Sequence, residues 1–145
     1  MRQPETQMAE SGPRAVARRI YTIGIWVLLA SIVIQFLLAG LGVFADSTFF
    51  SWHANVNGAV VGLLPLVLVA IGWYGRVRRS TLLLTAAIFG LVVVQSLLLF
   101  PYHMGATGLL RAVSGLHVVN ALVIFGVGLR LLEQSEAIRH NRAAG

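Results

Sequence analysis

The chain has 145 residues, of which 57% are hydrophobic and 11% are charged, and its net charge of +6 comes entirely from arginine. A soluble domain does not need so much apolar sequence, whereas helices that face lipid do. The absence of cysteine excludes disulfides, thiolate metal sites and cysteine-held iron–sulfur clusters. The arginines cluster outside the apolar runs, a pattern that reflects membrane topology, so we expect no nucleic-acid partner.

Four apolar segments follow one another, and each is near the ~20 residues that cross a bilayer. They cover about residues 20–44, 50–74, 81–100 and 112–132, between an N-terminal tail at 1–19 and a C-terminal tail at 133–145. The first is too long for the apolar part of a signal peptide, so we expect it to remain as an anchor. Because short loops make consecutive helices antiparallel, we predict an all-α, integral membrane four-helix bundle of up-down-up-down topology. In such a bundle the second and fourth spans are diagonal.

The arginines predict which way the bundle faces. They gather in the N-terminal tail, in the loop between the second and third spans, and in the segment 130–142. The positive-inside rule places both termini and that loop in the cytoplasm, so the loops that carry Asp46 and His103 face outward. We expect a bacterial-type inner membrane or plasma membrane, with residues 130–142 forming a helical extension at the cytoplasmic surface.

The two halves of the chain resemble each other. The segment Val33–Leu38 (VIQFLL) is similar to Val93–Leu98 (VVQSLL). Each is followed by an outward loop and by a helix that opens with a histidine and carries an asparagine about one turn later. Both halves run in the same direction, so the sequence predicts an approximate internal two-helix repeat about an axis along the membrane normal.

Histidines open both of the repeated helices. His53 and His117 each lie a few residues inside an apolar span, ~6–9 Å below the outer surface at the rise of an α-helix. A titratable imidazole in hydrocarbon is costly and is by default a candidate functional residue. Two of them at one depth on diagonal helices suit the two axial ligands of a single bis-histidine haem.

Polar and small residues near the histidines complete the candidate site. The asparagines are expected to orient the ligands or the nearby backbone, and the glycines to leave room for a porphyrin. The expected cofactor-binding residues are His53, His117, Asn57, Asn120, Gln35, Gln95, Arg111, Gly58 and Gly115, of which the two histidines are the metal ligands.

Each of these residues also has a structural interpretation. The histidines could bond to the glutamines and asparagines and hold helices together without a ligand. Arg111, the only arginine on the outward side, suits either a haem propionate or an anchor to lipid headgroups. His103 suits a solvated loop position, a cap over the haem, a partner contact or a replacement ligand, and Met104 is a further alternative ligand. In the second span, Pro65 predicts a kink, and Gly58 with Gly62 has the spacing of closely packed membrane helices.

Two short motifs carry a resemblance to a known family. The run Leu116–Leu122 (LHVVNAL) and the pair Trp52–His53 resemble the histidine-bearing helices of haem A synthase. Each half of that enzyme is a four-helix bundle with haem ligands on its second and fourth helices, which implies that His53 and His117 are paired ligands. The resemblance covers about residues 20–132. The chain also resembles a family of small, uncharacterised four-helix membrane proteins with LHxxN on the last helix.

One departure from haem A synthase limits what the resemblance implies. That enzyme has a glutamate near its substrate-side histidine, whereas the four spans here contain no carboxylate. This difference argues against oxygenation of a haem methyl group. The single bundle is more similar to the cofactor half of the enzyme than to its catalytic half.

The main functional hypothesis is a membrane b-type cytochrome that binds one haem b in its outer half. It would exchange electrons with a redox partner or a larger membrane complex on the outer side. The cytoplasmic half has no histidine or methionine suited to a second haem, so a partner subunit, a quinone or a homodimer would complete a path across the membrane. The alternatives are a cofactor-free accessory or assembly subunit, and a haem-modifying or quinol-oxidising enzyme, which the missing carboxylates count against.

Overall fold

The computed structural model describes residues 12–143, with side chains described as far as Glu136. This part of the chain is helical and contains no strand. It has four helical segments that are long and apolar enough to cross a membrane, which confirms the predicted bundle: Pro13–Phe44, Thr48–Tyr74, Arg79–His103 and Gly108–Glu136. Residues 1–11 of the expected N-terminal tail, and the side chains of Arg139, His140 and Arg142, lie outside the described part.

The first and last segments are dominated by long helices, α2 (Pro13–Phe44) and α8 (Leu116–Ala143). The second segment consists of α3 (Thr48–Val56), a π-helix η1 (Asn57–Gly62) and α4 (Leu63–Tyr74). The third consists of α5 (Arg79–Leu98) and α6 (Phe100–His103). Before α8 the chain forms α7 (Gly108–Ala112) and a single 3-10 turn, η2 (Val113–Gly115).

The helical segments begin and end within four residues of the predicted spans, except at the two ends of the chain. Helix α2 begins at Pro13, seven residues before the expected start at Ile20, because proline suits the first turn of a helix and alanine and arginine follow it. Helix α8 continues to Ala143 without a break, so the expected helical extension belongs to the same helix as the fourth span.

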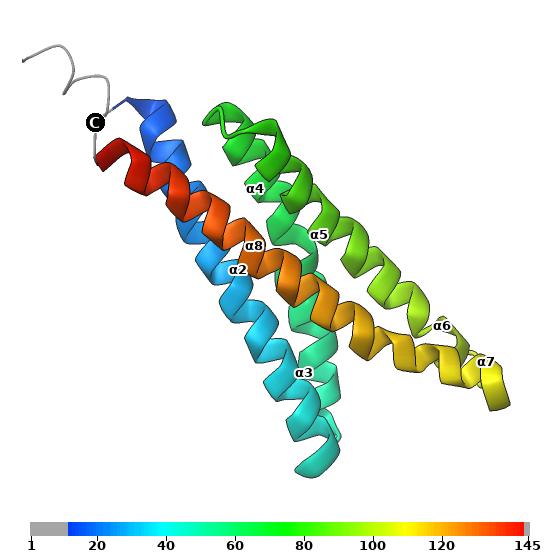
Figure 1. Cartoon of the computed structure of the whole chain (residues 1–145). Helices are drawn as coiled ribbons and strands as arrows, with labels where there is room; N and C mark the ends of the chain where they lie inside the picture. Colours follow the sequence, from blue (N-terminus) through cyan, green and yellow to red (C-terminus); the bar gives the residue numbers. More distant parts are fainter. Residues whose placement is uncertain (1–11, 144–145) are drawn as a thin grey trace, which may run out of the picture.

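The four segments pack in a ring. Helix α2 contacts α4 and α8, and α5 contacts α4 and α8, so the segments that carry the two histidines are diagonal, as predicted. The helix ends near both termini and the α4–α5 turn lie together at one end of the bundle (Figure 1). We call this the arginine end and the opposite one the histidine end.

Apolar side chains fill the bundle and also cover its outside. Many large aliphatic and aromatic side chains are exposed along all four segments, as on a surface that faces lipid. The buried cluster extends through the middle of the bundle and consists of Tyr21, Ile25, Leu28, Ile32, Val61, Leu68, Ile88, Val92, Ile124 and Leu131.

The arginine end is closed by buried and partly buried hydrogen bonds between the segments. The hydroxyl groups of Tyr21 and Thr85 are 2.6 Å apart and join α2 to α5. The Thr81 hydroxyl donates to Oε1 of Gln134 at 3.0 Å and joins α5 to α8. Polar groups bonded in this way hold membrane helices together, so this end has a structural explanation that needs no ligand.

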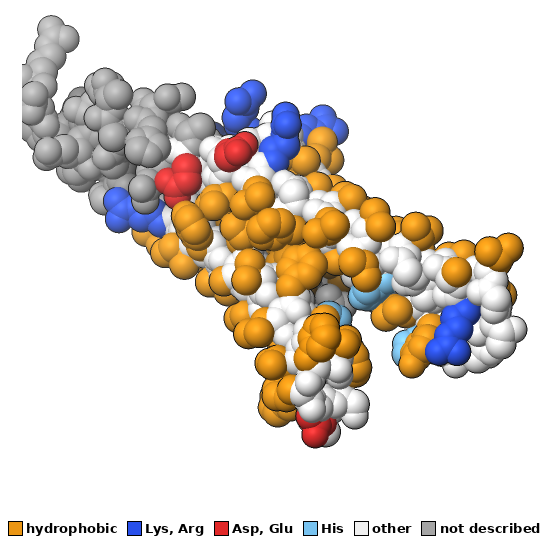
Figure 2. All heavy atoms as spheres, turned by 60° about the horizontal axis from the view of Figure 1, so that its bottom comes forward, with side chains coloured by type: hydrophobic (Ala, Val, Ile, Leu, Met, Phe, Trp, Pro, Cys, Tyr) orange, Lys and Arg blue, Asp and Glu red, His pale blue; other side chains and the backbone are white. Residues whose placement is uncertain are grey.

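The histidine end divides into two arms. Helix α3 packs on α2 and η1 and has no comparable packing against α5 or α8 in the described chain. The α2–α3 turn is tight, since a Cβ added at Gly42 would lie 2.8 Å from the Phe50 ring. Figure 2 shows a notch between the arms with histidine side chains beside it. The bundle is therefore tight at one end and open at the other.

A kink is the prediction for Pro65, and the structure has a π-helix, η1, shortly before this residue. A proline has no N–H group that could donate a hydrogen bond to the carbonyl oxygen four residues earlier. A local π-turn is one way in which a membrane helix adapts to the missing bond. Gly62 is buried, but a Cβ added at Gly58 would meet no atom within 4 Å. Within this chain, only one of the two glycines packs closely.

Candidate functional site

Each of the two histidines is hydrogen-bonded to the glutamine of its own half. Nδ1 of His53 lies 3.1 Å from the backbone oxygen of Gln35, which pairs α3 with α2. Nδ1 of His117 lies 3.1 Å from the backbone oxygen of Gln95, which pairs α8 with α5. The two contacts occupy equivalent places in the two halves, so the internal repeat extends to the geometry of the site.

The backbone carbonyls decide which ring nitrogen carries the proton. A carbonyl oxygen accepts a hydrogen bond but cannot donate one, so Nδ1–H is the donor in both rings. In a neutral imidazole the other nitrogen, Nε2, is then unprotonated and presents a lone pair. This is the arrangement of a metal-binding histidine, in which a second hydrogen bond fixes the tautomer and the ring plane.

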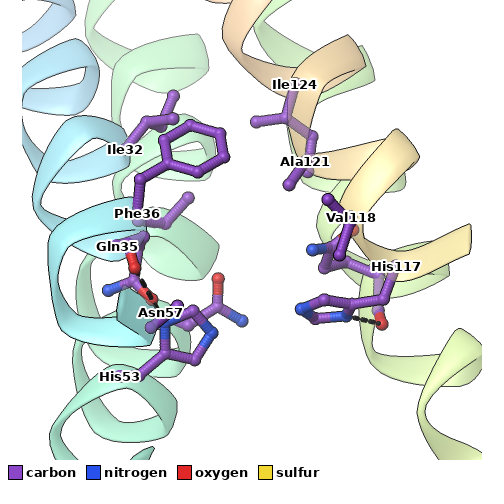
Figure 3. A pocket seen from close by; sticks show the side chains of 12 residues that line it. Ile32, Gln35, Phe36, His53, Asn57, His117, Val118, Ala121 and Ile124 are labelled. Carbon is purple, nitrogen blue, oxygen red and sulfur yellow. Dashed lines mark hydrogen bonds between the residues drawn. The ribbon is translucent and has the colours of Figure 1, made fainter. Parts of the chain in front are cut away.

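The two rings face each other across a groove. Their centroids are 6.3 Å apart and their planes make an angle of 54°. Figure 3 shows His53 and His117 pointing toward each other from opposite walls. No described residue donates a hydrogen bond to either Nε2. Two lone pairs directed into one apolar space favour an electron-pair acceptor, such as a metal ion, between them.

The groove lies between α2 and α3 on one side and α8 on the other. Its cavity volume is about 140 Å³, which is below the ~300–1,000 Å³ that is usual for ligand pockets. The polar residues that line it are Gln35, His53, Asn57, Gln95 and His117. The apolar ones are Ile32, Phe36, Ala39, Val61, Val118, Ala121 and Ile124.

The distance between the rings suits a metal ion between them. Bonds of about 2 Å from one ion to two imidazoles, with each nitrogen about 1 Å from its ring centre, put the centroids about 6 Å apart, close to the observed 6.3 Å. A structural or catalytic zinc ion needs three or four protein ligands. The described residues contain no cluster of three or more His, Cys, Asp or Glu. A porphyrin brings its own nitrogens, so two histidines complete its iron, and the donor set fits haem better than a bare ion.

Several predicted site residues do not line the groove. Gly58 and Gly115 are exposed, with no atom within 4 Å of an added Cβ. The Arg111 guanidinium carbon lies 5.1 Å from the centroid of the Tyr102 ring, on the arm formed by α6 and α7. His103 and Met104, the alternative ligands, are exposed on the same arm and are not among the lining residues.

Sequence reasoning missed the apolar wall of the groove. Phe36 lines the groove, and its ring meets Phe125 of α8 edge to face, with the centroids 6.1 Å apart. Ile32 and Ala39 lie on the same side of α2, one turn before and one turn after the polar Gln35. That helical spacing was a visible signal, but it does not distinguish a pocket wall from ordinary helix packing.

The chain was also compared with known proteins. Residues 35–103, a little under half of the chain, match the model of a family of unknown function (DUF6220). No curated protein and no solved structure matches the chain. The matched segment includes Gln35, His53 and Gln95 but ends before His117. The resemblance to haem A synthase therefore stays an expectation from the residues, and the chain is similar over this segment to a family whose function is not known.

Proposed function

We propose that the chain is a membrane b-type cytochrome that binds one haem b between His53 and His117 and transfers electrons. One observation carries this proposal. Two imidazoles on diagonal segments donate Nδ1–H to backbone carbonyls, and their rings face each other with centroids 6.3 Å apart. When bound, the haem would supply a one-electron couple, and two histidine ligands would suit it to electron transfer because they leave no open coordination position.

The described side chains have separate tasks in this proposal. The histidines would hold the iron from the two faces of the ring. The apolar lining would exclude water, which is one way in which a protein sets a redox potential. Arg111 remains a predicted partner for a propionate, since it lies on an arm that borders the notch.

We also propose the orientation that the arginines predict. The arginine end would face the cytoplasm and the groove would lie toward the outer surface. No second pair of facing histidines occurs in the described part of the chain. A redox partner or larger membrane complex on the outer side, or a second copy of the chain, would therefore complete any path across the membrane.

The main alternative is a cofactor-free accessory subunit in which the histidines serve only to join helices. Each histidine does join helices, but only within its own half: His53 to α2 and His117 to α5. Neither ring bonds to the other half, and both direct their remaining nitrogen into the groove. This arrangement favours the cytochrome over the accessory subunit. An enzyme is less favoured, because no carboxylate lines the groove.

The test is the visible spectrum of the detergent-purified protein after supplying haem. We expect a Soret band and a reduced α band in the parent, and the loss or strong shift of both in His53→Ala and in His117→Ala. His103→Ala is the matched control, because this histidine is exposed and outside the groove. A parent without bands would overturn the cytochrome and favour the accessory subunit. Unchanged bands in both groove variants would show that other residues hold the haem.

A further inference from the structure

Two arginine-bearing segments that are far apart in the sequence meet on the surface of the arginine end. Nη1 of Arg18, in α2, donates a hydrogen bond to the backbone oxygen of Gly75, just after α4, at 3.1 Å. A Cβ added at Gly75 would lie 3.2 Å from Cγ of Arg18, so the start of α2 directly contacts the α4–α5 turn. We call this place the arginine corner, and its arginines are Arg14, Arg18, Arg19, Arg76, Arg78 and Arg79.

The positive charge of the arginine corner has no counterpart nearby in the sequence. Between residues 13 and 132 the only acid is Asp46, which lies in the α2–α3 turn at the histidine end. Glu133 and Glu136 belong to α8. Five arginines of the corner, all except Arg18, are exposed, and their side chains make no hydrogen bond or ion pair within the described part of the chain. The corner therefore presents guanidinium groups to the surroundings of the protein.

Arg76 occupies a backbone conformation that favours glycine. Its φ is 57°, the only positive φ of a non-glycine residue in the described chain. The Arg76 N–H donates to the Trp73 oxygen at 3.0 Å, and the Val77 N–H donates to the Gly72 oxygen at 2.9 Å. These two bonds form a common helix-ending motif, in which glycine is the usual residue at the left-handed position. An arginine is strained there, and the positive-inside rule does not explain why this position carries one.

The stability of the helices does not explain the arginines either. Arg78 and Arg79 stand at the start of α5 and Arg14 at the start of α2, and neither helix has an acid in its first turn. The start of a helix carries a partial positive charge, so cations are unfavourable there. An anion beside the corner would offset both the arginine charges and the helix dipoles.

The side chains beside the corner indicate which anion fits. Trp73 and Tyr74, which come directly before the turn, are 77% and 55% exposed. Exposed aromatic side chains at the end of a membrane span belong at the level of the lipid headgroups. Figure 2 shows arginine side chains at this end of the molecule with apolar side chains beside them. The arginines that follow the aromatic pair would therefore be at the depth of lipid phosphates.

We propose that the arginine corner binds the headgroup phosphate of an anionic phospholipid. Guanidinium groups of α2 and of the α4–α5 turn would hold the phosphate by charge-assisted hydrogen bonds, for which their planar fork is suited. The acyl chains would lie along the exposed apolar side chains next to Trp73. A lipid bound in this way would tie together the two segments that meet at Arg18 and Gly75. The inference goes beyond the proposed function and needs no haem, so it is tested on the protein without haem.

The first test measures quenching of tryptophan fluorescence in phosphatidylcholine vesicles that contain a brominated lipid. The part of the quenching that Trp73→Phe abolishes reports on the arginine corner. At equal mole fractions, brominated phosphatidylglycerol should quench this part more strongly than brominated phosphatidylcholine. Arg76→Gly should lower the apparent affinity for phosphatidylglycerol about fivefold. Arg111→Gln is the control, because it removes one arginine from the opposite end, and it should leave the affinity of the parent.

Three results of this experiment would overturn the inference. The first is equal quenching of the parent by the two brominated lipids. The second is the same loss of affinity in Arg76→Gly and Arg111→Gln, which would show an effect of the total charge. The third is loss of the lipid preference in excess inorganic phosphate, which would show that the corner binds a free anion.

The second test separates lipid binding from loss of the fold. Glycine adopts a positive φ without strain, so Arg76→Gly should be at least as stable as the parent in a zwitterionic detergent. Adding phosphatidylglycerol should raise the Tm of the parent, because the lipid binds the folded protein, and should raise the Tm of Arg76→Gly less. Phosphatidylcholine is the control lipid. Equal increases in the two proteins, or no increase in the parent, would overturn the inference, whichever protein is the more stable before lipid is added.

Discussion

The carbonyl oxygens of Gln35 and Gln95 orient the imidazoles, and these oxygens belong to the backbone. Any residue at positions 35 and 95 would provide the same acceptor, so the choice of glutamine needs a separate reason. At position 95 the reason is visible in the bond to Asn120. At position 35 the amide is unpaired and faces the groove, which is why the two glutamines should respond differently to the same substitution.

We therefore predict opposite effects of two leucine substitutions on the stability of the protein without haem. Gln35→Leu should be neutral or stabilising, because it removes a buried amide that has no partner. Gln95→Leu should destabilise by about 1 kcal/mol, because Asn120 loses one of its two acceptors. The measurement is unfolding in mixed micelles with increasing denaturing detergent. A larger loss for Gln35→Leu than for Gln95→Leu would contradict the assignment of the unpaired amide.

Asp46, in the turn between α2 and α3, gives a pH-dependent prediction. The Thr48 backbone N–H donates a hydrogen bond to the Asp46 carboxylate at 2.7 Å. This bond, together with one from the Thr48 side chain, holds the pKa of Asp46 below its ordinary value. Because the pKa of Asp46 is lower in the folded state, the stabilisation that these hydrogen bonds provide is fully present above the pKa of the unfolded state. It is lost as the pH falls through the pKa of the folded state.

When the pH is lowered below about 4, the protection of the Thr48 amide from hydrogen exchange should accordingly decrease. Asp46→Asn cannot titrate but still offers an oxygen acceptor, so in this variant the protection should no longer depend on pH. Exchange rates are compared after correction for the intrinsic effect of pH. The same pH dependence in the parent and in Asp46→Asn would assign the effect to another group.

At the scale of helices, the π-helix η1 determines how α3 is rotated relative to α4. A π-turn adds a residue to the turn, and one residue corresponds to about 100° around a helix axis. His53 precedes η1 and Pro65 follows it. The direction of the His53 ring therefore depends on an irregularity that the proline maintains.

Under the proposed function, Pro65→Ala should reduce the retention of the haem even though the residue does not line the groove. The new N–H can bond to the carbonyl of Val61, which favours a regular α-helix and turns α3 away from its present orientation. We expect haem to dissociate about tenfold faster, measured by transfer to apomyoglobin, with no loss of helicity by circular dichroism. Pro101→Ala, in α6 and away from the groove, is the control. Equal dissociation rates in Pro65→Ala and the parent would show that the proline does not position His53.

At the scale of the whole molecule, hydropathy and loop length were sufficient to predict the four spans and the diagonal placement of His53 and His117. The exposed Gly58 and Gly115 and the unpaired amide of Gln35 were not predictable. These features depend on how each helix is rotated about its axis and on where the two arms separate. The π-turn and the packing of α3 determine both. A periodic sequence fixes which face of a helix is small or polar, but not which neighbour that face meets.

The orientation of the molecule in the membrane can be tested directly by labelling single cysteines, because the chain contains no cysteine of its own. Ser47 and Ser80 are both exposed and lie at opposite ends of the bundle, at the α2–α3 turn and beside Arg79. Arginine-rich short loops are retained in the cytoplasm. In intact cells a membrane-impermeant maleimide should label Ser47→Cys, and should label Ser80→Cys only after the membrane is disrupted. The reverse pattern would place the groove toward the cytoplasm, and a redox partner would then have to be sought among cytoplasmic electron carriers.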